Sequence, residues 1–212
     1  MNSIKYFFLV ILTCTAFYAH AQVNAALSRT IDSLYNDDQA VQWQFREMHL
    51  RNAPADSIKR QDSLKKAVYR NELEVVKKIY AQYGYPTAAM VGPASSHNFF
   101  VLIQHADHDP AFQKQLLPVL DTLSLAGEIS RKDYAYLYDR IQHNTGGKQL
   151  YGTQPVYGKN GNLFDSNNKI MLPPDLEDPE NVDKRRKEIG LEPMEEYYET
   201  VLKALGRPRV KP

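Results

Sequence analysis

Apolar side chains recur with the spacing of amphipathic helices along most of the chain. The longest such stretch, 55–83, also contains many basic and acidic residues, which predicts a solvated helix face rather than a nucleic-acid surface. Similar patterns and helix-start signals predict helices over 94–107, 110–125, 131–142, 178–190 and 193–205. In the first helical stretch, 25–51, Asp37 or Asp38 resembles a cap that would divide it into two helices. We therefore expect a mainly α fold with about six to seven helices.

Segment 94–107 is the most apolar of the predicted helices that follow residue 22. Its five consecutive apolar residues, 99–103, predict that it is buried nearly all round at the centre of a bundle. Gln104 and His105 directly follow this run. A polar group in apolar surroundings costs about 1 to 3 kcal/mol unless it finds a partner. Both side chains are therefore candidates for a specific contact.

The composition of the chain changes after residue 154. Asn160-Gly161 stands between short apolar stretches, which is a strong hairpin signal, and Leu172-Pro173-Pro174 cannot be helical. We expect a small β-hairpin, an appendage over about 149–172, inserted before the last two helices. The whole of 22–212 is expected to form a single α-rich domain.

The first 21 residues have the pattern of a secretory signal peptide. A short segment with one positive charge, Lys5, precedes an apolar run over 6–18, and Ala19-His20-Ala21 matches a cleavage signal. A retained membrane anchor fits less well, since the run is shorter than the ~20 residues of a spanning helix. A lipoprotein anchored through Cys14 also fits less well. We expect cleavage near Ala21, export to the periplasm or the extracellular space, and no stable membrane insertion afterwards.

Charge and cysteine content exclude several function classes. The chain has 26 Lys and Arg and 25 Asp and Glu, and loss of Lys5 with the signal peptide makes the two numbers equal. This balance argues against binding to nucleic acid or to an anionic membrane surface. The only cysteine, Cys14, would leave with the same segment, so the mature chain would have no disulfide, thiol nucleophile or cysteine metal site. Neither a G-x-S-x-G motif nor a phosphate-binding glycine loop is present.

Residues 134–154 form the strongest candidate site. The predicted helix carries Asp139 and Arg140 and ends at Gly146-Gly147. A segment rich in hydrogen-bonding side chains follows, with Gln149, Tyr151, Thr153 and Gln154. These groups can hold a polar ligand. They can equally serve a structural turn, because buried polar side chains usually bond to neighbouring backbone.

Histidine chemistry would extend this site. His105 is suited to act as a general base, with Asp139 orienting it and Arg140 holding an anionic group. A satisfied core histidine and an ion pair between helices are the structural alternatives. His105 and His108 stand three residues apart, whereas zinc helices more often space two histidines by four. We therefore expect no metal and no other cofactor.

Several short motifs together resemble one family. They are QHAD at 104–107, DR at 139–140, Q-x-YGTQ at 149–154 and DP-x-x-VD-x-RR at 178–186. With these motifs the chain is similar, over about 37–197, to DUF6624, a bacterial family of unknown function. The resemblance implies a shared fold and no particular activity. It implies that the following residues are motif positions: Gln104, His105, Asp107, Asp139, Arg140, Gln149, Tyr151, Gly152, Thr153, Gln154, Asp183, Arg185 and Arg186.

Three functions remain open. The first is an exported module that binds a polar small molecule, sugar or peptide in one pocket built from the QHAD, DR and 149–154 segments, with Arg185 as a further contact. The second is a hydrolase or lyase that uses His105 as its base. The third is a structural or interaction role. The binding module is favoured because segment 149–154 contains more amides than titratable groups.

Overall fold

The computed structural model describes residues 23–158 and 161–206, so the predicted signal peptide lies outside the described residues. Within these ranges there are eight α-helices, one 3-10 helix and no β-sheet, which confirms a mainly helical fold. No described helix combines the length and hydrophobicity needed to cross a membrane. The elements are α1 (Ala25–Leu50), α2 (Ala55–Tyr83), α3 (Ala88–Val91), α4 (Pro93–Gln104), α5 (Pro110–Leu125), α6 (Arg131–Thr145), η1 (Pro179–Asn181), α7 (Val182–Glu188) and α8 (Met194–Ala204).

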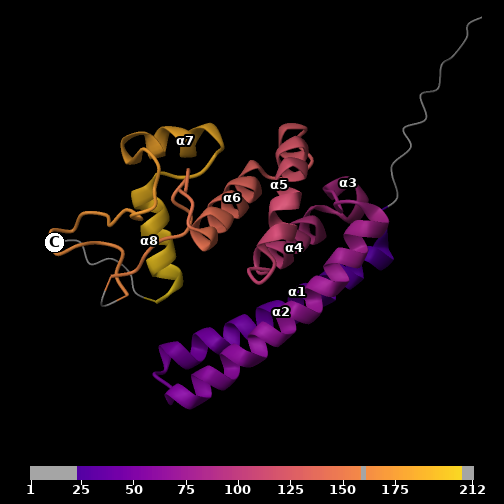
Figure 1. Ribbon diagram of the computed structural model, residues 1–212, viewed down its shortest axis with the longest axis horizontal. Helices are drawn as coiled ribbons and strands as arrows, with labels where there is room; N and C mark the ends of the chain where they lie inside the picture. Colours follow the sequence, from indigo (N-terminus) through magenta and orange to yellow (C-terminus); the bar gives the residue numbers. More distant parts are fainter. Residues whose placement is uncertain (1–22, 159–160, 207–212) are drawn as a thin grey trace, which may run out of the picture.

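Helices α1 and α2 form a long antiparallel pair that packs on α4 (Figure 1). The predicted break in the first helical stretch is wrong, because α1 is continuous from Ala25 to Leu50. Asp38 does not cap a helix. It lies in the middle of α1 on the same buried stripe as Ile31 and Val41. Its carboxylate contacts His105 at the end of α4.

Helix α4 is the centre of the main hydrophobic core. Its side chains Phe99, Phe100 and Ile103 are almost fully buried, as the apolar run predicted. Helices α1 and α2 pack on α4. Helix α6 also contacts α4, and it packs on α5 as well. This packing places the end of α4, with His105, next to α1, α2 and α6.

A second hydrophobic cluster organises the last third of the chain. Helices α7 and α8 share it with residues of the irregular segment before them, and Tyr136 of α6 packs against it. Figure 1 shows α6 between α5 and the α7–α8 region. The buried members are Leu163, Phe164, Leu176, Val182, Met194, Tyr197, Tyr198 and Leu202.

The described residues do not show the predicted β-hairpin. The described part of segment 149–178 has only two isolated bridges, one antiparallel between Phe164 and Ile170 and one parallel between Gln149 and Leu176. Asn160 of the expected turn lies outside the described residues. The carboxylate of Asp165 accepts backbone hydrogen bonds from residues 167 and 169, which closes a tight turn. Across this turn the pairing is limited to the single bridge between Phe164 and Ile170, which is too short to form two strands.

Candidate functional site

The carboxylate of Asp139 is the centre of segment 149–154. Asp139 is fully buried on α6. Its oxygens accept hydrogen bonds from the backbone N–H groups of Leu150 (2.7 Å), Tyr151 (3.2 Å) and Thr153 (2.9 Å). Burial raises the pKa of Asp139, whereas these three N–H groups lower it. The segment thus folds around one carboxylate, and this bonding fixes it to α6.

The Gln149 side chain bonds to the backbone of Gln154 and to the side chain of Asp175. The amide nitrogen of Gln149 donates to the carbonyl of Gln154 (3.0 Å) and to the carboxylate of Asp175 (2.9 Å). The Gln149 Oε1 accepts from the N–H of Gln154 at 3.0 Å. Gln149 is 0% exposed and Thr153 2% exposed. Their hydrogen-bonding groups are therefore used by neighbouring parts of the chain, as expected if segment 149–154 is a structural turn.

Two arginines of α7 bond to the backbone of this segment. Arg185 donates to the carbonyl of Leu150 (2.8 Å), and Arg186 donates to the carbonyl of Tyr151 (2.6 Å). Arg186 is fully buried, and its guanidinium lies 4.8 Å from the centroid of the Tyr197 ring. Arg185, suggested by the sequence as a ligand contact, thus joins segment 149–154 to α7.

A separate cavity of about 430 Å³ contains the candidate histidine. The structure brings His105 and Arg140 together in its lining and leaves Gln104, Asp139 and segment 149–154 out of it. This arrangement differs from the single pocket suggested by the sequence. Adjacent residues of a helix point about 100° apart, so Arg140 faces the cavity while Asp139 faces segment 149–154. The lining residues are Gln42, Lys65, Lys66, Tyr69, Arg70, His105, Asp107, His108 and Arg140.

His105 is hydrogen-bonded to the carboxylate of Asp38, and not to that of Asp139. Nδ1 of His105 lies 2.6 Å from Oδ2 of Asp38. Asp38 is 0% exposed, whereas the His105 side chain is 17% exposed. When Nδ1 carries a proton and donates it to this carboxylate, Nε2 is left with a free lone pair. The pair therefore has the chemistry of a base whose orientation is fixed by a buried acid.

Tyr69 of α2 holds the plane of the imidazole. Its ring stacks on that of His105, with centroids 4.9 Å apart and an interplanar angle of 22°. The Tyr69 hydroxyl donates to Oε1 of Gln42 at 2.9 Å. Burial raises the pKa of Tyr69, so the phenol is neutral at physiological pH. The histidine is thus fixed through its edge by Asp38 and through its face by Tyr69.

Positive charge predominates in the cavity lining. Arg140 donates two hydrogen bonds of 2.7 Å to Asp107, and Lys66 lies 2.6 Å from Asp62. The Arg70 side chain has no hydrogen bond or ion pair to any other described residue. Apart from histidine and tyrosine, the titratable lining residues are four basic and one acidic: Lys65, Lys66, Arg70, Arg140 and Asp107.

The charge of Arg70 acts on its neighbour His108. Burial lowers the pKa of His108, and the positive charge of Arg70 lowers it further. In the part of the chain that is described, no group of three or more His, Cys, Asp or Glu side chains is placed to hold a metal ion. The His105 cavity thus places basic side chains beside an imidazole that is hydrogen-bonded to a buried carboxylate.

Sequence reasoning missed Asp38 and the role of the α2 cations. A signal for Asp38 existed, because it interrupts the buried stripe of Ile31 and Val41 on α1. An acid on an apolar stripe is buried and must find a partner. A capping residue instead lies at a helix end, so this position could have distinguished the two roles. The basic residues of α2 carried no such signal, since their spacing matches that of a solvated face.

One family matches most of the chain. The model of the family of unknown function DUF6624 covers residues 25–211. The chain belongs to DUF6624. The His105 cavity and segment 149–154 both lie within the matched region, and the resemblance inferred from the short motifs is confirmed. Searches of curated proteins and of solved structures found no match to this DUF6624 chain.

Proposed function

We propose that the cavity beside His105 is an active site in which His105 acts as a general base. The observation that carries this proposal is the 2.6 Å contact between His105 Nδ1 and the buried Asp38 carboxylate, at the wall of a cavity that His105 lines. A carboxylate at Nδ1 orients the ring and stabilises the imidazolium that forms when Nε2 takes a proton. This geometry favours an acid–base function over a module that only binds.

The lining charges indicate the chemical class of the substrate. Arginine and lysine bind carboxylates and phosphates through charge-assisted hydrogen bonds. Arg70 has no partner among the described residues, and Lys66 and Arg140 stand in the same lining. The volume of about 430 Å³ suits a small molecule. The substrate is therefore a small polar compound with a carboxylate or phosphate group.

The reaction class follows from what a neutral imidazole can do. Nε2 can remove a proton from a water molecule, which then attacks an ester or amide carbonyl and displaces the alcohol or amine. It can also remove a proton from the carbon next to a carbonyl, with cleavage of the bond to a leaving group on the next carbon. In both reactions the imidazolium returns its proton to the departing group. Both reactions develop negative charge that the nearby arginines can stabilise. The function is thus that of a hydrolase or lyase, with Asp38 as a positioning residue for His105.

Binding of the anionic group is tested first, with inorganic phosphate and acetate as probes. In ¹⁵N spectra of the labelled protein, either anion should shift the ring nitrogens of His105 in a saturable manner, and Arg70→Gln should weaken this effect at least several-fold. His143 provides the matched control. Its Nδ1 lies 2.9 Å from a carboxylate oxygen of Asp175, but its side chain is 41% exposed and outside this cavity. Its resonances should not move.

Catalysis is tested with a panel of carboxylate- and phosphate-bearing esters and elimination substrates. For any compound that is turned over, His105→Gln should lower the rate by roughly 10² to 10⁴-fold, the usual contribution of a general base. Asp38→Asn should lower kcat with little change in binding, and His143→Gln should do neither. A rate that survives in His105→Gln would refute the proposal. Anion binding without turnover across the panel would instead support the binding module.

We also propose that the chain is exported after cleavage near Ala21. Support comes from the charged, apolar and small-residue regions of residues 1–21. Mass spectrometry of the protein from the periplasmic or extracellular fraction should show a first residue at Gln22. Retention of Met1 in a membrane fraction would contradict this proposal and leave the function of the His105 cavity unaffected.

A further inference from the structure

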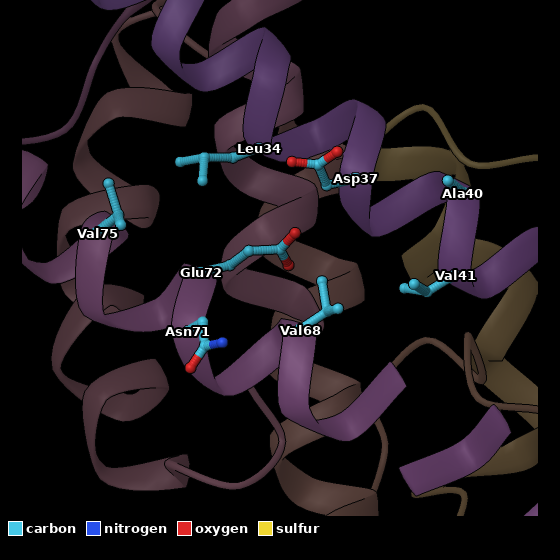
Figure 2. Close-up of a pocket in the computed structure, with 8 residues that line it drawn as sticks. All are labelled: Leu34, Asp37, Ala40, Val41, Val68, Asn71, Glu72 and Val75. Atoms are coloured by element: carbon cyan, nitrogen blue, oxygen red, sulfur yellow. The ribbon is translucent and has the colours of Figure 1, made fainter. Parts of the chain in front are cut away.

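A second cavity, of about 400 Å³, lies between α1 and α2, and the proposed active site does not use it. Apolar side chains dominate its lining, together with two acids and one amide. Figure 2 shows these residues around the space between the two helices. Helix α1 contributes Leu34, Asp37, Ala40 and Val41, and α2 contributes Val68, Asn71, Glu72 and Val75. We call this cavity the α1–α2 groove.

Glu72 is the unusual residue of the groove. It is only 6% exposed, and its Oε1 is buried without a hydrogen-bond partner in the described part of the chain. Figure 2 shows its carboxyl group projecting from α2 toward α1, in the middle of the lining residues. Burial raises the pKa of Glu72 to about 8, and the negative charges of Asp38 and Asp37 contribute to this rise. A buried acid of this kind lacks the partner that such groups normally have.

The groove also lacks a positive charge. No lysine, arginine or histidine is among its lining residues, and the charged groups that act on Glu72 are both aspartates. An added cation would therefore favour the ionised form of Glu72, which becomes a charged hydrogen-bond acceptor, and would gain a second carboxylate at Asp37. An added anion would be repelled by Asp37 and would gain no cationic partner in the lining. A neutral alcohol would gain the first contact without the second.

We propose that the α1–α2 groove binds a small aliphatic primary ammonium compound, with the ammonium group between Glu72 and Asp37. The hydrocarbon chain lies against the apolar side chains of Leu34, Val41 and Val68. Since these side chains have no polar groups, none loses a hydrogen bond to water when the chain binds. This site is distinct from the His105 cavity and does not depend on the function proposed there.

Three probes of equal chain length separate charge from hydrophobic contact: n-butylammonium, n-butanol and n-butyrate. Titration at neutral pH, followed by amide resonances of α1 and α2, should show saturable shifts with n-butylammonium at millimolar concentration. Butanol should bind at least tenfold more weakly, and butyrate should not bind. Equal binding of butanol and butylammonium would overturn the assignment of a cation site. Absence of binding by all three would overturn the site itself.

Variants of the two acids identify the contacts. Glu72→Gln keeps the shape of the side chain and should weaken n-butylammonium at least tenfold. Asp37→Asn changes an exposed residue, so the fold is not at risk, and it should weaken binding several-fold. Glu74→Gln is the matched control, since Glu74 is an exposed acid on the same helix outside the groove. Equal effects of Glu74→Gln and Glu72→Gln would show a general charge effect and refute the proposal. Resonance shifts that depend on protein concentration alone would show that another copy of the chain fills the groove, which would also refute it.

Discussion

Asp139→Asn is the sharpest test of how the last third of the chain is held to the bundle. The asparagine side chain has the same shape, and its oxygen can still accept from Leu150 and Tyr151. Its NH₂ group, however, would face the N–H of Thr153, which now lies 2.9 Å from Oδ2 of Asp139. One buried N–H group would lose its acceptor, and two other hydrogen bonds would lose the charged acceptor.

The expected loss can be worked out from these contacts. A hydrogen bond to a charged group contributes about 1 kcal/mol more than a neutral one, and an unpaired buried N–H costs about 1 to 3 kcal/mol. Removal of the buried charge also relieves part of its burial penalty. Together these effects lower the free energy of unfolding by about 1 to 3 kcal/mol. For a chain of this size, each 1 kcal/mol lowers Tm by about 2 to 4 °C. Urea and thermal unfolding followed by circular dichroism measure both quantities.

Asp165→Asn is the matched control. The Asp165 carboxylate also accepts backbone hydrogen bonds, from residues 167 (2.8 Å) and 169 (2.9 Å), but the residue is exposed. Water can replace the lost bonds there, so the free energy of unfolding should change by less than about 1 kcal/mol. A loss at Asp139→Asn no larger than at Asp165→Asn would refute the view that segment 149–154 folds around a carboxylate.

Three further predictions concern the stability of the fold. Gly152 has φ +65°, and a Cβ there would lie 2.9 Å from Met194. Gly152→Ala should therefore lower the free energy of unfolding in urea by about 1 to 3 kcal/mol. Gly127→Ala, whose added Cβ would meet nothing within 4 Å, should lower it less, and equal losses would contradict this. The pKa of Glu72 is raised from 4.5 to about 8 in the folded chain, so stability should fall as pH rises from 4.5 to 8, by roughly 5 kcal/mol at most. Glu72→Gln should lack this fall, and parallel pH profiles of variant and wild type would show that Glu72 is not the cause. Dialysis against a strong chelator should leave Tm unchanged, whereas a drop that zinc restores would reveal a structural metal.

The sequence predicted helices well where local signals mark their ends. Proline at the start of α5 and glycine after α2 act through backbone geometry alone, so these two helices begin and end within a few residues of their expected limits. The predicted break near Asp38 failed because an acid can serve either as a cap or as a buried partner. Its true partner, His105, is 67 residues away, and periodicity carries no information on such distances.

The candidate site was predicted in part for the same reason. The motif residues His105 and Arg140 do share a cavity, and segment 149–154 does form a tightly bonded unit. The link between the two was wrong, since the sequence does not show toward which neighbour each of two adjacent helix residues points. Asp139 and Arg140 are about 100° apart around α6. Asp139 therefore binds segment 149–154, whereas the adjacent Arg140 lines the cavity.

The same geometry on α1 sets a limit on how this protein can change. Asp37 faces the α1–α2 groove and Asp38 contacts His105, so the two neighbouring acids serve two different faces of one helix. Insertion or deletion of a single residue between Ile31 and Asp37 would turn both acids by about 100°. An insertion would bring Asp37 to the former position of Asp38, and a deletion would bring Asp38 to the former position of Asp37. Substitutions on this turn can be compensated by local repacking, but a change in its length cannot. The number of residues between Ile31 and Val41 therefore sets the directions of Asp37 and Asp38, and it is constrained more strictly than the identity of those residues.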